Sequence, residues 1–181
     1  SAAVNKSPGD WYGIRLVQGS VSLSHFVIEH AVAGLRLEDS DTRFDGYLVT
    51  HGIIRATRDY AVYQTGSQGT VELNDLTVTN NSYGIYTDGP LLVRDSRINR
   101  NTAFGFYGNG GSLTLTNCDV STNDSYGVYM QNKALVVQSC TIRANQGYGL
   151  IAFQSSADVR DSQIQRTTGT GVYLQRPSPV T

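Results

Sequence analysis

The chain has 181 residues and a formal net charge of −1 at pH 7, with 14 Lys and Arg against 15 Asp and Glu. This balance lacks the positive excess that binding to a phosphate backbone needs, so we expect no nucleic acid partner. Hydrophobic residues make up 39% of the chain, but the apolar runs are too short for a spanning helix, so we expect no membrane insertion. The 19 glycines and 11 tyrosines favour short strands and tight turns over helices, which predicts an almost entirely β protein.

The first ten residues have no charged segment followed by an apolar stretch, so they do not have the form of a secretory signal peptide. We interpret residues 1–10 as a linker. The chain is then expected to be a processed piece or one module of a larger protein.

A repeat of about 22 residues follows the linker. Its most regular feature is a glycine followed by an apolar residue, with Ala61 taking the place of one glycine; the glycines are Gly13, Gly34, Gly84, Gly105, Gly127, Gly149 and Gly171. Each unit holds short segments of alternating polarity separated by polar turns, and none shows helical spacing. Three short strands in each unit predict about eight coils of a parallel β-solenoid over residues 11–175, followed by a tail at 176–181.

A leucine-rich repeat is the competing interpretation, because residues 113–123 are similar to its strand consensus. The rest of that unit, residues 124–130, reads as a further strand and not as a leucine-bearing arch. This favours the solenoid with three strands in each coil.

Four segments carry Asn, two variable residues, an aromatic residue and Gly, at residues 80–86, 101–107, 123–129 and 145–151. They resemble the repeats of right-handed parallel β-helix proteins, the pectate-lyase-like group. The resemblance implies an all-β, single-stranded right-handed parallel β-helix. It leaves function open, because the group holds lyases, hydrolases, epimerases, phage tailspikes and catalytically silent surface domains.

Equivalent residues of successive coils lie above one another in a solenoid, so each position in the repeat forms a column. The column four residues before Gly is rich in Asn and predicts a hydrogen-bonded ladder at the turns; its members are His30, Thr57, Asn80, Asn101, Asn123, Asn145 and Thr167. A second column holds mostly small residues and predicts a tight interior corner; its members are Phe26, Gly52, Leu76, Ser96, Cys118, Cys140 and Ser162. The two cysteines would lie close enough for a disulfide, but their side chains run side by side, so we expect free thiols.

The column two residues after Gly is expected to point outward and is rich in tyrosine, at Tyr63, Tyr86, Tyr107, Tyr129 and Tyr173. These rings could simply shield the sheet, form a contact surface for a protein, or provide a stacking platform for sugars. They are the candidate binding residues.

The bend after the apolar pair carries a second outward column, which includes His51, Asp75 and Asp95, with Arg97 nearby. As an alternative function, these four residues could catalyse acid–base chemistry on a uronate, with the arginine binding the carboxylate. Ordinary turn chemistry explains the same residues. The sequence also lacks the motifs of the polygalacturonases, alginate epimerases and pectate lyases that it resembles.

The insertion at residues 38–46 holds four carboxylates, and Asp39, Asp41 and Asp45 could offer oxygens to Ca²⁺. Arg43 lies among them, and the closing Glu of a calcium loop is absent, so an acidic surface loop is the default interpretation. No other cofactor is expected.

Neither end of the chain looks like a capping helix, which favours one module of a longer surface protein over a complete enzyme. We therefore expect a non-catalytic module for binding or display, located outside the cell or in the cell envelope. Its partner would be a polysaccharide or a surface protein. The alternative is a polysaccharide lyase, hydrolase or epimerase, and the oligomeric state stays open.

Overall fold

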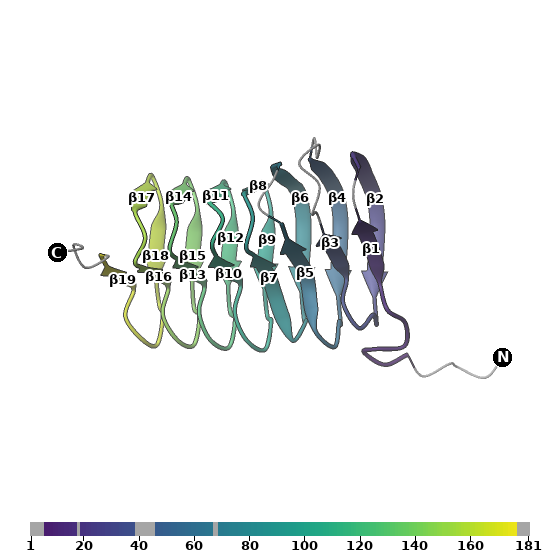
Figure 1. Ribbon diagram of the computed structural model, residues 1–181. Helices are drawn as coiled ribbons and strands as arrows, with labels where there is room; N and C mark the ends of the chain where they lie inside the picture. The colour runs from purple at the N-terminus through teal and green to yellow at the C-terminus, as the bar shows by residue number, and fades with distance from the viewer. Residues whose placement is uncertain (1–5, 18, 39–45, 67–68, 177–181) are drawn as a thin grey trace.

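The computed structural model describes residues 6–17, 19–38, 46–66 and 69–176, and in these ranges every regular element is a β-strand. The strands wind into a right-handed parallel β-solenoid, with the two ends of the chain at opposite ends of the stack (Figure 1). The all-β prediction is confirmed. The described residues include no helix long and apolar enough to cross a membrane.

One wall of the solenoid is an eight-stranded sheet in which every neighbouring pair is parallel. Six of the strands begin directly after the glycine of a repeat, whereas β5 and β7 begin one residue before Ala61 and Gly84. The strands are β1 (Ile14–Val17), β3 (Leu35–Glu38), β5 (Tyr60–Thr65), β7 (Tyr83–Thr87), β10 (Phe106–Asn109), β13 (Val128–Gln131), β16 (Leu150–Phe153) and β19 (Val172–Gln175).

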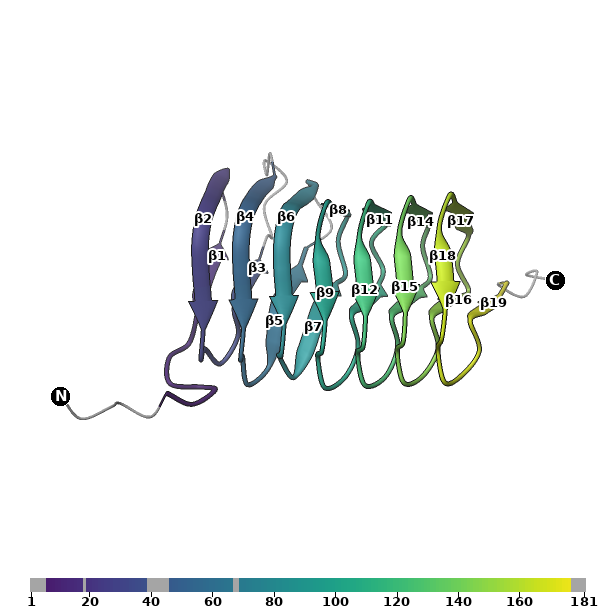
Figure 2. The same cartoon turned by 180° about the vertical axis from the view of Figure 1, so that it is seen from behind.

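The rest of each coil belongs to an eleven-stranded sheet that bends at one corner. Three long strands cross this corner unbroken: β2 (Val21–Glu29), β4 (Tyr47–Arg55) and β6 (Val71–Thr79). Later coils have two strands instead, and β6 pairs with both β8 (Leu91–Arg94) and β9 (Arg97–Asn99). The same division gives β11 (Leu113–Thr116), β12 (Asp119–Ser121), β14 (Leu135–Gln138), β15 (Thr141–Arg143), β17 (Ala157–Arg160) and β18 (Gln163–Gln165), as Figure 2 shows from behind.

The solenoid has about seven turns, against about eight expected from the repeat. The first sheet has eight strands, which are joined by seven complete turns of the chain, and each corner column has seven members. The number of repeats in the sequence therefore equals the number of strands in this sheet, which is one more than the number of complete turns.

Two columns of residues in the left-handed region of backbone space turn the chain in each coil. The first column follows the apolar pair and has φ of 50–55°; it comprises His25, His51, Asp75, Asp95, Asn117, Ser139 and Asp161. The second has φ of 53–59° and comprises His30, Ala56, Asn80, Arg100, Thr122, Ala144 and Arg166. This conformation is energetically unfavourable for a residue other than glycine. It persists because hydrogen bonds to neighbouring coils hold each corner in place.

The core is a stack of aliphatic columns, as the repeat predicts. The β-branched column is fully buried at Ile54, Val78, Ile98, Val120 and Ile142, each 0% exposed. These residues give the solenoid a continuous apolar interior, so its walls need no further layer of secondary structure to bury their apolar side chains.

The asparagine ladder exists, but its predicted register is wrong in two coils. The buried ladder runs through Thr57, Asn81, Asn101, Asn123 and Asn145, in which each side-chain oxygen accepts the backbone N–H of the coil before it. Asn80 and His30 belong instead to the second corner column, where Asn80 is exposed and His30 is partly exposed. The spacing from the ladder to Gly is three residues in these coils and four in the others, so counting back from Gly missed the shift.

The predicted linker is described from Lys6 onward. The backbone N–H groups of Gly9 and Asp10 donate to the His30 carbonyl, and Trp11 forms a parallel bridge with Ala31. The predicted tail lies outside the described residues except for Arg176, and so do Asp39, Asp41 and Asp45 of the candidate calcium loop.

Candidate functional site

The predicted tyrosine column lies on the outer side of the eight-stranded sheet. Strand register places Tyr63 beside Tyr86, Tyr86 beside Tyr107, and Tyr107 beside Tyr129. The ring centroids of these pairs are 5.0, 5.8 and 4.7 Å apart, with interplanar angles of 12–14°. The four side chains therefore form one face-to-face stack that runs along the solenoid axis.

A second aromatic column lies beside this stack, and the sequence interpretation missed it. It is formed by the residue just before each glycine or its equivalent: Tyr60, Tyr83, Phe104, Tyr126 and Tyr148. Its rings contact the first column at centroid distances of 5.1–6.0 Å and are inclined to it by 38–64°. The signal was present in the sequence, since an aromatic residue precedes Gly in four successive repeats.

We call the ten rings of these two columns, Tyr173 included, the aromatic face. The stacked rings of Tyr86 and Tyr107 have a neighbouring ring on both of their faces, so they present mainly edges and hydroxyl groups to solvent. In the second column Tyr60 and Tyr83 also stack, with ring centroids 4.9 Å apart, whereas Phe104 is tilted by 39° against Tyr83 and Tyr148 by 47° against Tyr126. A sugar that stacks on this sheet would therefore use Phe104, Tyr126 and Tyr148 more readily than the predicted column.

The stack is interrupted near its C-terminal end, where Ile151 takes the tyrosine position and is only 6% exposed. Tyr173, one coil further on, is 42% exposed and touches Tyr148 edge-on, with their ring centroids 6.0 Å apart. The predicted binding residues thus form a stack of four and one separate ring.

Charged residues close the aromatic face at its N-terminal end. The guanidinium of Arg36 lies 5.0 Å from the ring centroid of Tyr63, a cation–π contact. Glu38 accepts hydrogen bonds from Arg15 and Arg36, and the bond from Arg15 is the main reason that the pKa of Glu38 falls below its ordinary value.

Burial raises the pKa of Tyr60, Tyr63 and Tyr129 above the ordinary value for tyrosine. These three phenols therefore stay protonated at neutral pH, and Tyr129 Oη donates a hydrogen bond to Gln131 Oε1 at 3.1 Å.

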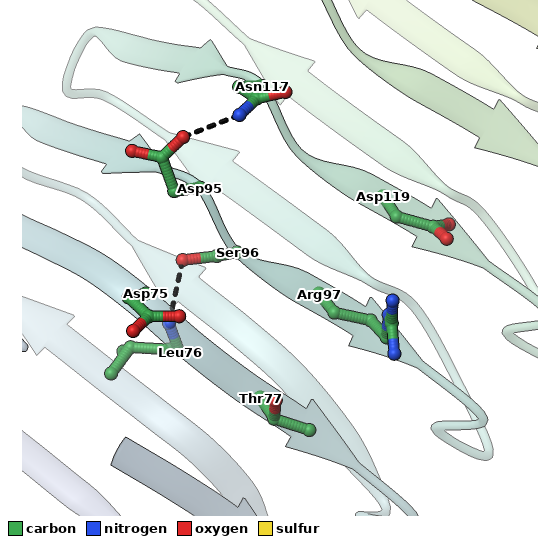
Figure 3. Close-up of a pocket in the computed structure, with 8 residues that line it drawn as sticks. All are labelled: Asp75, Leu76, Thr77, Asp95, Ser96, Arg97, Asn117 and Asp119. Carbon is green, nitrogen blue, oxygen red and sulfur yellow. Dashed lines mark hydrogen bonds between the residues drawn. The ribbon is translucent and has the colours of Figure 1, made fainter. Parts of the chain in front are cut away.

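The second predicted site lies on the bent sheet, at the first corner. Asp75, Asp95 and Arg97 all line one surface hollow, together with Leu76, Thr77, Ser96, Asn117 and Asp119 (Figure 3). Within the described residues Arg97 forms no ion pair, whereas Asn117 Nδ2 donates to Asp95 Oδ1 and Arg143 binds Asp119 at 3.0 Å. We call this site the bend hollow.

His51 lies next to the bend hollow without lining it. Its Nε2 is 3.6 Å from Asp75 Oδ2, and its ring stacks on His25 with centroids 4.7 Å apart. The structure thus brings together three of the four candidate catalytic residues. Asn117, from the same corner column, also lines the hollow. The structure adds Thr77 and Asp119, which a column-by-column interpretation did not group with the candidates because they belong to the strands beyond the corner.

The described residues contain no cluster of three or more His, Cys, Asp or Glu placed to hold a metal ion. Cys118 and Cys140 are free and buried, as expected for adjacent members of one interior column.

Comparison with known families agrees with the resemblance seen in the repeats. The family model described as "Right handed beta helix region" matches residues 33–179, most of the solenoid. The chain belongs to this family. No curated protein and no solved structure matches the chain.

Proposed function

We propose that this chain is a non-catalytic module that binds a polysaccharide through the aromatic face, outside the cell or in the cell envelope. The supporting observation is the pair of aromatic columns on an outer sheet wall that no other described segment covers. Such a strip is long along the solenoid axis and only two rings wide. A narrow strip suits a single extended polymer chain better than the broad patch of a typical protein interface.

The polarity of the surroundings favours an uncharged glycan. The next column along the same strands continues from Glu38 through Thr65, Asp88, Asn109, Gln131, Phe153 and Gln175, and its charged members, Glu38 and Asp88, are both acidic. Amide and hydroxyl groups beside inclined aromatic rings are the groups with which proteins hydrogen-bond to sugar hydroxyls and cover the apolar sides of sugar rings. The absence of a basic residue from this column argues against a uronate ligand.

Affinity electrophoresis tests this proposal with gels cast with neutral, uronate or bacterial-envelope polysaccharides. We expect a neutral glycan to retard the protein, and we expect F104A/Y126A/Y148A to abolish the retardation. The variant T114A/V136A, which alters an outward column of the other sheet, is the matched control and should be retarded like the unmodified chain. Circular dichroism must show that all variants fold.

The absence of retardation in every gel would contradict glycan binding. A protein captured through the same face, and lost in the same variant, would then assign the surface to a protein partner.

A polysaccharide-active enzyme is the second candidate function, and the bend hollow is the observation that favours it. Asp75, Asp95 and Arg97 line the same hollow, which gives it the carboxyl and guanidinium groups that acid–base chemistry on a uronate uses. The same hollow follows from turn chemistry, because Asp75 and Asp95 belong to a corner column that continues through all seven coils.

An enzyme and a structural corner predict different results when the chain is incubated with a polysaccharide. We expect no new reducing ends or unsaturated sugar ends from uronate polysaccharides incubated with the chain. Turnover that disappears in D95N and in R97Q, while T141A retains it, would establish the enzyme instead.

A further inference from the structure

The interior corner column places two thiols on adjacent coils. Thr116 pairs with Gln138, and Asp119 pairs with Thr141, so Cys118 and Cys140 lie in register between these pairs. Both residues are buried, 3% and 2% exposed, and both are free. The backbone N–H of Cys118 donates to Cys140 Sγ at 3.4 Å, which holds the sulfur of Cys140 against the coil that contains Cys118.

This placement suits a metal ion better than a disulfide. A disulfide needs a sulfur–sulfur bond of about 2.05 Å and side chains that converge, with Cβ atoms about 3.8 Å apart. In-register side chains of parallel strands instead stand side by side at the strand spacing of about 4.8 Å. Two metal–sulfur bonds of about 2.3 Å in a straight line span about 4.6 Å, so a linear S–metal–S unit matches one coil spacing.

We propose that Cys118 and Cys140 form a buried two-coordinate site for a soft d¹⁰ metal ion such as Cu(I). Thiolate ligands select soft ions, and Cu(I) accepts two ligands in line. Zn²⁺ prefers four ligands, and the described residues offer no third His, Cys, Asp or Glu at this position. The site is independent of the aromatic face, which lies on the other sheet.

Each sulfur lies close to a backbone carbonyl group. Cys118 Sγ lies 3.3 Å from the Thr116 carbonyl oxygen, and Cys140 Sγ lies 3.1 Å from the Gln138 carbonyl oxygen. Binding of one monovalent ion would release both thiol protons, so the two thiolates and the ion together would carry a net charge of −1.

Both thiols must lose their protons when the ion binds. Affinity should rise with pH, because protons compete with the ion for sulfur.

Competition with a coloured Cu(I) chelator, under anaerobic conditions and with the full chain, tests the site. We expect one Cu(I) per chain and no binding of Zn²⁺. C118S and C140S should each weaken Cu(I) binding by more than about 100-fold, beyond the 10–100-fold loss typical of groups that only support a ligand. Serine already occupies this column at Ser96 and Ser162, so both variants should fold.

A pair of cysteines moved by one coil tests whether Cu(I) binding depends on the spacing between adjacent coils. Combining C140S with S96C puts thiols at positions 96 and 118, again one coil apart, because Arg97 pairs with Asp119. This double variant should recover Cu(I) binding. Stoichiometric binding that persists in either single variant, or no recovery in the double variant, would overturn the shared site, and so would an intramolecular disulfide in the chain isolated without reductant.

Discussion

Asn123 shows how much a single ladder residue does for this fold. Its Oδ1 accepts the backbone N–H of Asn101 at 3.2 Å, and its Nδ2 donates to the Ile98 carbonyl at 3.3 Å. It also donates to Asn145 and accepts from the Asn101 side chain. The ladder therefore pairs buried backbone groups at a corner where neither sheet can reach them.

We expect N123A to lower the free energy of unfolding by about 2–4 kcal/mol, because it removes the acceptor of the buried Asn101 backbone N–H and the other hydrogen bonds of this side chain. Asn80, which the sequence pattern assigned to the same ladder, gives the control. It is an exposed corner residue with φ of 56°, so N80G keeps the turn and should change stability by less than about 1 kcal/mol. Urea unfolding followed by circular dichroism measures both. Equal losses would mean that the ladder runs through Asn80.

The sequence pattern assigned Asn80 instead of Asn81 to the ladder for a physical reason. The repeat reveals the spacing between residues along the chain, but the ladder is set by hydrogen bonds between coils. The connection between the second corner and Gly absorbs one residue more or less without disturbing either strand. The sequence could therefore predict that a ladder exists but not which of Asn80 and Asn81 belongs to it.

At the scale of the strand, the glycine column controls how closely successive coils approach. A Cβ built on Gly127 would lie 2.5 Å from the Gly149 carbonyl oxygen and 2.8 Å from Ile142 Cγ2. Gly171 occupies the same column in the last coil, and its Cβ would meet nothing closer than Ile164 Cγ2 at 3.8 Å. Gly127 is thus required by the next coil and not by its own backbone conformation, whereas Gly13 of the same column has φ of 91°.

G127A should destabilise the solenoid by about 1–3 kcal/mol, since the added methyl group forces two coils apart. G171A tests the explanation at a matched position and should change the free energy of unfolding by no more than about 0.5 kcal/mol. Thermal unfolding of both variants is the measurement. A large loss in G171A would show that glycine is needed for local backbone freedom.

The aromatic face was predictable in part at this scale. Alternation along each strand correctly placed Tyr63, Tyr86, Tyr107 and Tyr129 on the outer side of the sheet, because side-chain direction follows from the strand alone. The inclination of the second column depends on how neighbouring rings fit together, which no periodicity encodes. The bend hollow is similar, since Asp95 at the corner and Asp119 in β12 line it together only because of how successive coils fold around that corner.

The whole molecule behaves as a one-dimensional stack, in which each coil is stabilised mainly by the coils directly before and after it. The described ends differ from the middle. In β19, Val172 and Leu174 are 41% and 60% exposed although they continue apolar columns of the core, whereas the corresponding residues of β13 are fully buried. Stability should therefore fall from the central coils toward the last one.

The first coils depend on ion pairs as well. Glu29 binds Arg55 and Lys6, and Glu38 binds Arg15 and Arg36. These hydrogen bonds, led by Arg55 for Glu29 and by Arg15 for Glu38, lower the pKa of both carboxyl groups in the folded chain. A carboxyl group with a lowered pKa adds stability above its unfolded pKa of about 4.3, and this contribution is lost as the pH falls through the folded value.

Hydrogen exchange read by mass spectrometry at two pH values tests both effects together. At pH 7 we expect the slowest exchange in β10 and β13 and the fastest in β19, because only the central strands are covered by intact coils on both sides. After correction for the intrinsic pH dependence of exchange, opening at pH 3 should increase most in β1–β4, where the two carboxyl groups with a lowered pKa are paired. High salt at pH 7 should produce part of the same change, since the pairs are exposed and screened. Uniform protection along the chain would show that the solenoid opens as one cooperative unit. Acid-induced opening that begins in β19, whose residues form none of the described ion pairs, would show that the exposed apolar end, and not ion pairing, limits stability at low pH.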